Sequence, residues 1–429
     1  MGEGDLVADG PAITDEGIAR LRARVGVPQP HPQPPRYLCP NEDAFRQVAE
    51  AYGDDNPLWC DPEYAASTCW GGPIAPPPLV GGDTLVGENE VTEIRKEDRE
   101  LMKGDPIRGA HAFYSGSFRE WWAPLRPGTR VTRRNALVGV TEKSSEFAER
   151  AVHEWTGEVF AAREPTPVVL SAQYRLMIRT ERKNAEERGK YDDTTIEPYT
   201  DEQLGEIDDA YAREPERRRG AQPRWWDDVE EGDEVGPLVK GPLRVTDMVC
   251  WHAGMGMGLY GVKALRLGYQ QRQRVPRFFR PDDLNVPDVQ QRVHWDAEWA
   301  RRAGNPAVYD YGRMRETWLV HLCTDWMGDD AWLWKLDCQF RRFNYVGDTH
   351  WMRGRVVRKF LAEGDRPAVE LELRGENQRG ELTTPGHATI LLPSREHGAV
   401  RLPPTPGGAT TCQDALDALV ERFANEERA

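Results

Sequence analysis

One arrangement of elements occurs twice in this chain, about two hundred residues apart. Each copy begins with a helix, at residues 41–52 and again at 247–254, and continues with a short polar motif, a second helical segment and a run of strands. The chain has 429 residues, which is more than a single hydrophobic core usually serves. The repetition therefore predicts two domains of similar construction.

Alternation of apolar and polar residues predicts the strands of both copies. A helix followed by antiparallel strands favours an α+β fold, in which each sheet wraps around one helix. In the first copy the strands are expected at 112–120, 128–140, 145–155 and 159–162, and in the second at 332–343, 349–360, 368–375 and 386–393.

The predicted domain organisation follows from changes in composition along the chain. Five prolines between Val27 and Arg36 favour an extended arm, the highly charged stretch after residue 182 favours a linker, and the polar segment Gln413–Arg428 favours a surface helix. We expect an N-terminal arm (1–36), a first domain (37–182), a linker (183–222), a second domain (223–400) and a C-terminal tail helix (401–429).

Composition excludes several classes of function. The net charge of −15 opposes binding to nucleic acid, because such binding depends on neutralised phosphates. The seven cysteines form no CxxC pair, so neither a disulfide framework nor a structural metal site is expected, and buried free thiols are the simplest interpretation. There is no apolar run of the ~20 residues that a membrane span needs, and MGEGDLVADG is not a signal-peptide pattern. We therefore expect a cytoplasmic protein that does not contact the membrane.

The second polar motif carries the clearest chemistry. His294 and Asp296 lie at the end of an extended run, a short helix follows at 297–303, and Gly312 begins a longer helix that is expected to end near residue 327. An unperturbed histidine can exchange protons near neutral pH, and a helix N-terminus can stabilise an anion. The pattern predicts a small reaction centre.

These residues resemble the hydratase motif of MaoC-like enoyl-thioester hydratases, which contains G-D-x-N-P-[IL]-H-x-D followed by a glycine that opens a central helix. In the second copy, the matching positions are His294, Asp296, Ala300, Gly304, Pro306 and Gly312. In the first copy they are Gly53, Asp54, Asn56, Pro57, Leu58 and Asp61. Trp59 stands where the first copy should have its histidine, and an indole cannot accept a proton. The first half resembles the MaoC-type N-terminal dehydratase-like domain, and the resemblance implies a double hotdog fold.

The resemblance implies a hydro-lyase that adds water to an enoyl thioester or removes it from a 3-hydroxyacyl thioester. His294 would be the base, and the backbone N–H of Gly312 would stabilise the enolate oxygen. An insertion separates the second helix from its motif, so the family's aspartate has no direct counterpart. Further catalytic candidates are Asp288, Asp310, Asp296 and His252, and candidates for substrate binding are Asp54, Asn56, Trp59, Arg341 and Arg353.

The implied substrate is a thioester of coenzyme A or of an acyl carrier protein, with no separate cofactor or metal. A homodimer is expected, because hotdog sheets commonly pair edge to edge. Four arginines of the insertion are candidate phosphate contacts or simply a solvated basic loop: Arg272, Arg274, Arg277 and Arg280.

Structural roles remain open for the same residues. His294 would then pin a turn, Asp296 and Asp54 would cap helix ends, and His252 would pack in the core. Two other functions also remain open. One is a non-catalytic thioester-binding or partner subunit with two degenerate sites, and the other is a hotdog thioesterase.

Overall fold

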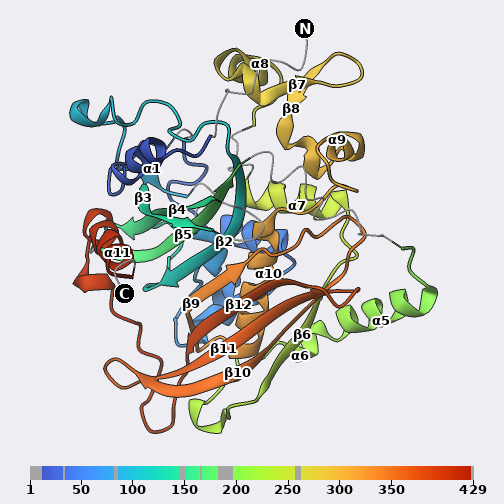
Figure 1. Ribbon diagram of the computed structural model, residues 1–429. Helices are drawn as coiled ribbons and strands as arrows, with labels where there is room; N and C mark the ends of the chain where they lie inside the picture. The colour runs from blue at the N-terminus through green and yellow to red at the C-terminus, as the bar shows by residue number, and fades with distance from the viewer. Residues whose placement is uncertain are drawn as a thin grey trace.

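A single ten-stranded sheet runs through the molecule (Figure 1). The computed structural model describes residues 12–31, 34–81, 86–144, 150–164, 167–181, 197–256 and 262–426. The strand order is β1-β3-β4-β5-β2-β9-β12-β11-β10-β6. The strands of the first half are β1 (Glu88–Asn89), β2 (His111–Trp121), β3 (Val131–Lys143), β4 (Ala151–Ala162) and β5 (Val168–Thr180). Those of the second half are β6 (Glu234–Lys240), β9 (Trp332–Gln339), β10 (His350–Ala362), β11 (Arg366–Asn377) and β12 (Leu382–Leu391).

The two halves have the same strand order. When the five strands of each half are numbered along the chain, both halves read 1-3-4-5-2 from the outer edge of the sheet to its centre. The second strands, β2 and β9, pair antiparallel from Gly116↔Gln339 to Glu120↔Lys335 and so join the halves edge to edge. The predicted α+β double hotdog is therefore confirmed, and its two sheets are continuous.

The central helix of the second half is α10 (Gly312–Met327), as predicted. Its residues from Arg313 to Met327 are all buried, with Leu319, Leu322 and Cys323 in the main core. The corresponding stretch of the first half contains a short 3-10 helix, η2 (Pro77–Leu79), and residues 82–85 lie outside the described part of the chain. Successive prolines remove the N–H groups that an α-helix needs there.

The first helices of the two repeats, α2 (Glu42–Ala51) and α7 (Val245–Met255), pack against each other. A Cβ on Gly254 would approach the Cβ of Ala51 and the carbonyl oxygen of Gln47 to 2.4 Å, so this crossing requires a glycine. Both helices were predicted. Their contact means that the repeats share one core, because residues of α2, α7 and α10 belong to the same buried cluster.

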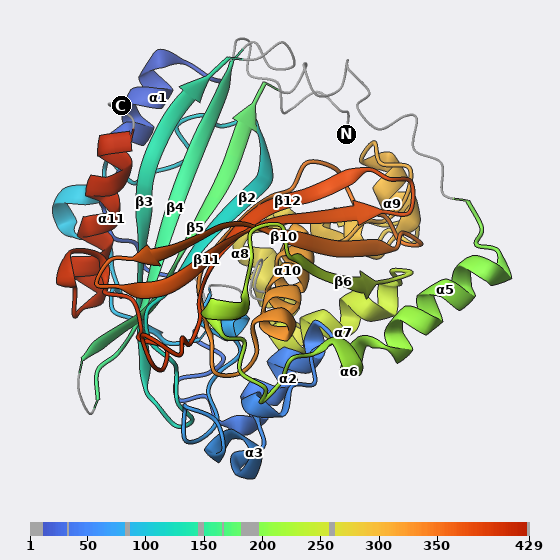
Figure 2. The same ribbon diagram turned by 90° about the horizontal axis from the view of Figure 1, so that it is seen from below.

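Three predictions for the segments outside the two repeats are wrong in part. The arm contains α1 (Asp15–Arg22), which buries Ile18 and Leu21 against Ile107 and Leu137. The prolines that favoured an extended arm all follow this helix, so they do not affect it. The tail helix α11 (Cys412–Glu426) is not a polar cap. It buries Cys412, Ala415, Leu416 and Leu419 against the outer face of β3 and β4 (Figure 2).

The third correction concerns how the linker packs, because weak helical periodicity from Glu202 to Arg213 already favours a helix there. Its described part contains α5 (Asp201–Ala212) and α6 (Glu214–Arg217). Ile207 and Ala210 are buried in a small cluster with Val239 of β6. These two apolar side chains, together with hydrogen bonds between Tyr211 and the backbone of Gly241, dock a segment whose composition favoured solvent.

Two strand predictions are also wrong, because β5 was missed and β4 was divided in two. The prediction that the cysteines are buried fails for three of the seven, Cys39, Cys69 and Cys250, which are exposed. The remaining elements are α3 (Pro62–Ala66), α8 (Leu265–Arg274), α9 (Ala297–Arg302) and the small hairpin β7 (Phe279–Pro281) and β8 (Pro287–Val289). Within the described residues, no helix combines the length and the apolar character needed to cross a bilayer.

Candidate functional site

The polar motif of the first half shows how the repeat arranges its side chains. Asp54 and Trp59 are both buried, and the indole Nε1 of Trp59 donates a hydrogen bond to Asp54 Oδ2 at 2.9 Å. Tyr52 donates to the same oxygen at 3.2 Å. Positions five residues apart in this motif therefore face each other, and tryptophan occupies the place where the family motif has histidine.

The second motif repeats this turn. The 3-10 helix η1 (Pro57–Trp59) leads to α3 with Asp61 as N-cap, and η6 (Gln290–His294) leads to α9 with Asp296 as N-cap. The residue five positions before His294 is Val289, which is buried. Each half thus keeps one member of the motif pair: Asp54 lacks its histidine, and His294 lacks its aspartate.

His294 is fixed in orientation and nearly enclosed, with 9% of its surface exposed. Its Nδ1 lies 2.8 Å from the carbonyl oxygen of Tyr309. Because a carbonyl can only accept, Nδ1 carries the proton, and Nε2 keeps its lone pair. The ring stacks on Tyr311 with centroids 3.9 Å apart. Burial, the largest influence, lowers the pKa of His294 to about 4, so the imidazole is neutral at pH 7.

Gly312 follows Tyr311 directly and is the first residue of α10. The N–H groups in the first turn of a helix have no partner within the helix, and the helix dipole makes this end attractive to negative charge. A Cβ at this position would approach the ring of Phe340 to 2.9 Å. Close packing against Phe340 is therefore one reason why this position is a glycine. The expected approach of a thioester oxygen is a second.

His252 on α7 belongs to the same aromatic group. Its ring meets Tyr311 edge to face with centroids 4.3 Å apart, and Trp251 stacks on Tyr311 with centroids 5.7 Å apart. Neither ring nitrogen of His252 has a hydrogen-bond partner among the described residues. Burial lowers the pKa of His252 to about 4. Two neutral imidazoles, His252 and His294, therefore border one tyrosine.

The three carboxylates that were candidate partners of His294 have other contacts. Asp296 accepts from the backbone N–H of Trp299 at 2.9 Å, the helix-capping role left open above. Asp310 is buried and lies 2.9 Å from Arg315 Nε, and burial raises its pKa to about 6 despite that guanidinium. Asp288 is half-buried on β8 and accepts from the N–H of Val289. No contact between these three carboxyl groups and the ring of His294 is found in the described residues.

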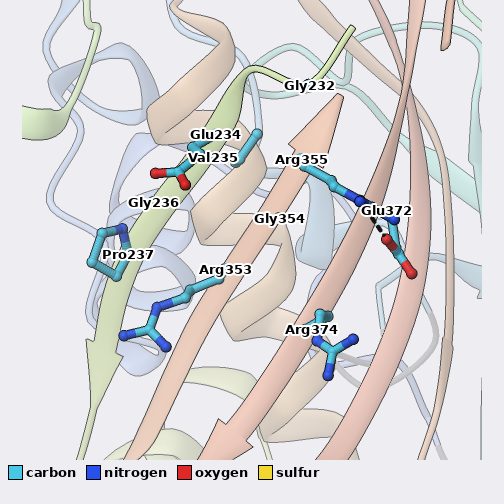
Figure 3. A pocket seen from close by; sticks show the side chains of 10 residues that line it. All are labelled: Gly232, Glu234, Val235, Gly236, Pro237, Arg353, Gly354, Arg355, Glu372 and Arg374. Atoms are coloured by element: carbon cyan, nitrogen blue, oxygen red, sulfur yellow. Dashed lines mark hydrogen bonds and ion pairs between the residues drawn. The ribbon is translucent and has the colours of Figure 1, made fainter. Parts of the chain in front are cut away.

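The candidates for substrate binding do not form one site. Asn56 caps η1 through Leu58 N and donates to Asp329 Oδ1 at 2.8 Å, and Arg341 is exposed beside Gln339. Arg353 lies on β10 and faces a surface groove of about 580 Å³ between β6, β10 and β11. Figure 3 shows Arg353, Arg355 and Arg374 along this groove, with Glu372 paired to Arg355 at 2.7 Å. The structure thus separates Asp54 and Asn56, which are buried, from two arginines at the surface.

Sequence reasoning missed a buried charge cluster around Asp54. His321 of α10 places its Nε2 3.8 Å from Asp54 Oδ1 and 3.4 Å from Asp325 Oδ2, and its Nδ1 lies 2.8 Å from Lys240 Nζ. The linker contributes Glu214 and Arg218. The chain order gave no signal, because these residues come from four separate segments: the turn after α2, the region of α6, β6 and α10. Only the spacing of His321 and Asp325, one helical turn apart, could have suggested a pair.

Asp54, His321 and Asp325 are close enough to share one cation. The ammonium of Lys240 and the guanidinium of Arg218 already contact the cluster and balance two of its three carboxylates. We therefore treat it as a buried ion-pair network that joins the first half, the linker and α10.

Comparisons with known proteins support the fold. No family model matches the chain, and no curated protein matches its sequence. A solved MaoC-like dehydratase superposes with a TM-score of 0.55 at 16% identity, covering 86% of this chain and 99% of that one. A MaoC-domain dehydratase from Chloroflexus aurantiacus gives a TM-score of 0.50 at 12% identity, covering 87% and 96%.

A conserved hypothetical protein from Mycobacterium tuberculosis with a double hotdog fold gives 0.45 at 11% identity, covering 83% and 93%. At these identities the likeness concerns the fold. The likeness to the two dehydratases, with TM-scores of 0.55 and 0.50, agrees with the repeated strand order and with the architecture that the motif residues implied.

Proposed function

We propose that this chain, built on the double hotdog fold of the MaoC-like dehydratases, adds water to enoyl thioesters or removes it from 3-hydroxyacyl thioesters in its second half. One observation carries the proposal. A neutral, buried His294 with its Nδ1 anchored on a backbone carbonyl is stacked on Tyr311, the residue immediately before the N-terminus of α10.

In the hydration direction, Nε2 of His294 would accept a proton from water as the water oxygen bonds to Cβ of the enoyl group. The electron pair of the double bond moves to the thioester carbonyl, and the backbone N–H of Gly312 stabilises the enolate oxygen. The imidazolium of His294 then returns the proton to Cα. One imidazole serves as both base and acid in this scheme, because Val289 replaces the aspartate of the motif.

The first half lacks the groups for this chemistry. Trp59 supplies only a donor, and η2 begins at Pro77, whose nitrogen carries no hydrogen. The turn of the first half therefore has no histidine, its Asp54 is engaged by the donors Tyr52 and Trp59, and Pro77 offers no N–H where α10 offers that of Gly312. We assign catalysis to the second half and a packing role to the motif of the first.

The test is turnover of enoyl-CoA and 3-hydroxyacyl-CoA thioesters by the pure protein, with loss or gain of the conjugated double bond as the readout. His294→Gln should lower kcat by about 10² to 10⁴, the usual contribution of general acid–base catalysis. The control is His387→Gln, which changes an exposed histidine on β12. Equal activity of the His294→Gln variant and the wild type would overturn the assignment.

A second function has one observation in its favour. The absence of a carboxylate beside His294 in the described residues fits a subunit that binds thioesters without turning them over. Saturable binding of an acyl-CoA with no change in the double bond and no free thiol would establish it, whereas release of free thiol would indicate a thioesterase.

A further inference from the structure

The insertion between α7 and η6 exposes an unusual amount of apolar surface. Of the thirteen large apolar side chains that are exposed in the described chain, six fall between residues 265 and 286. They are Leu265 (93% exposed), Leu267, Tyr269, Val275, Leu284 (82%) and Val286. Single exposed apolar residues are ordinary, but such a concentration marks an interaction surface.

The same segment is basic in an acidic protein. Residues 262–281 contain six basic side chains and no acidic one, while the whole chain has a net charge of −15. These are Lys263, Arg266, Arg272, Arg274, Arg277 and Arg280. Across residues 12–31, 34–81, 86–144, 150–164, 167–181, 197–256 and 262–426, no carboxylate pairs with any of them. Their charge therefore remains available to a partner.

The insertion is fastened to the turn that carries His294. Arg292 of η6 donates to the carbonyl oxygens of Arg280 and Pro281 at 2.9 and 3.2 Å, and Gln290 donates to that of Arg277 at 2.8 Å. Strand β8 runs directly into η6. In Figure 1, α8 and the β7–β8 hairpin stand out from one end of the molecule, beside α9. A partner bound there would lie next to the proposed reaction centre.

We propose that α8 and the β7–β8 hairpin dock a small acidic carrier protein that presents the acyl group to His294 as a thioester. This inference rests on the proposed function and specifies its substrate. Arginines combined with exposed leucine and tyrosine fit an acidic protein surface with an apolar centre. The phosphates of free coenzyme A would use the arginines alone.

Two other occupants fit less well. An anionic membrane would attract the same arginines, but it would not present an acyl thioester to the turn that carries His294, to which the insertion is hydrogen-bonded. A second copy of this chain would bring together two molecules of net charge −15. The insertion shows no feature that matches a particular face of that second copy.

The experiment compares one enoyl group on three carriers: an acyl carrier protein, coenzyme A and a short pantetheine-like thiol that has neither protein nor nucleotide. The triple variant Arg272→Glu, Arg274→Glu, Arg277→Glu reverses the charge at three positions of this basic surface. The control variant Arg46→Glu, Arg95→Glu, Arg213→Glu makes the same charge change at exposed arginines outside the insertion.

For the wild type we expect the highest kcat/KM with the carrier protein, together with a steep decrease as salt rises. The patch variant should lose about 10²-fold on the carrier protein, lose its salt dependence, and stay within about threefold on the short thioester. The control variant should behave like the wild type. A loss of equal size on all three substrates, or no loss, would overturn the docking proposal.

Binding separates this proposal from the proposed function. If the wild type turns over none of the three substrates, the hydro-lyase assignment fails, but calorimetric binding of the carrier protein should still be abolished in the patch variant. Carrier binding unaffected by the variant would refute the docking surface. The docking surface would also be refuted if the only effect of the variant were loss of binding to anionic vesicles. The same holds if its only effect were a change from dimer to monomer.

Discussion

His294 owes its neutral state to its surroundings. Tyr309 and Tyr311 remove water from the ring, and the cost of charging a desolvated imidazole outweighs the help of the carbonyl at Nδ1. The sequence located this histidine and its place before the central helix. It could not show that the residue five positions earlier meets this side chain, a contact that the first half makes between Asp54 and Trp59.

The pH dependence of catalysis should reflect this environment. The pKa of His294 is lowered from 6.5 to about 4, so the deprotonated, active imidazole persists above that value and is lost as the pH falls through it. We expect the acid limb of kcat/KM near pH 4, with little loss between pH 7 and 5. The profile should be measured with circular dichroism at each pH to confirm folding. An acid limb near 6.5 would mean that the ring is solvated.

Asp296 should behave as a helix cap. It accepts from Trp299 N, as Asp61 accepts from Glu63 N and Tyr64 N in the first half. Asp296→Ala and its matched control Asp61→Ala should each lower the free energy of unfolding by about 1 kcal/mol, with kcat nearly unchanged. Denaturant unfolding and steady-state kinetics test this. A large loss of kcat in Asp296→Ala at unchanged stability would place Asp296 in the chemistry.

At the scale of elements, α10 shows what the sequence could and could not predict. Its start at Gly312 was predicted from the motif, and its length from the apolar residues. Because the helix is buried on every side, its polar residues are buried too, and they need partners elsewhere: Arg313 donates to the carbonyl oxygen of Gly81, and Glu316 meets Arg119 of β2. Such pairs join segments that are remote in sequence, so no local pattern reveals them.

The alternation of apolar and polar residues predicted the strands that have one polar face, but it did not predict strands that are buried on both faces. In β5, residues 169–174 are buried without interruption, so the apolar–polar pattern that marks a half-exposed strand is absent. Helices α1 and α11 were misjudged from prolines or average polarity, although each has one apolar face.

Gly312→Ala tests the packing at the start of α10. The added methyl group would lie 2.9 to 3.2 Å from the ring of Phe340, so we expect a loss of about 1 to 3 kcal/mol in unfolding free energy. Adding Phe340→Leu should restore much of that stability by making room. Thermal unfolding of the single and double variants measures this. An undiminished stability of Gly312→Ala would show that Phe340 moves aside freely.

At the scale of the whole molecule, two features make the repeats one unit. The sheet continues across β2 and β9, and the network of Asp54, Glu214, Lys240, His321 and Asp325 links the first half, the linker and the second half. We therefore expect one cooperative unfolding transition instead of two.

Lys240→Met tests the network. Removing the only lysine of this buried group leaves its carboxylates short of positive charge, and breaking one side of a buried pair typically costs about 3 to 5 kcal/mol. The control Lys96→Met, at an exposed position, should stay within about 0.5 kcal/mol of the wild type. Equal stability of both variants in denaturant unfolding would show that the network contributes nothing to holding the halves together.

The fate of the water oxygen tests the central claim most directly. The pure protein and its His294→Gln variant are incubated with an enoyl thioester in ¹⁸O-labelled water, and the products are analysed by mass spectrometry. The account predicts one label at C3 of an intact 3-hydroxyacyl thioester, formed by the wild type and nearly absent with the variant. Label in a free carboxylic acid, or C3 label formed equally by both proteins, would contradict it.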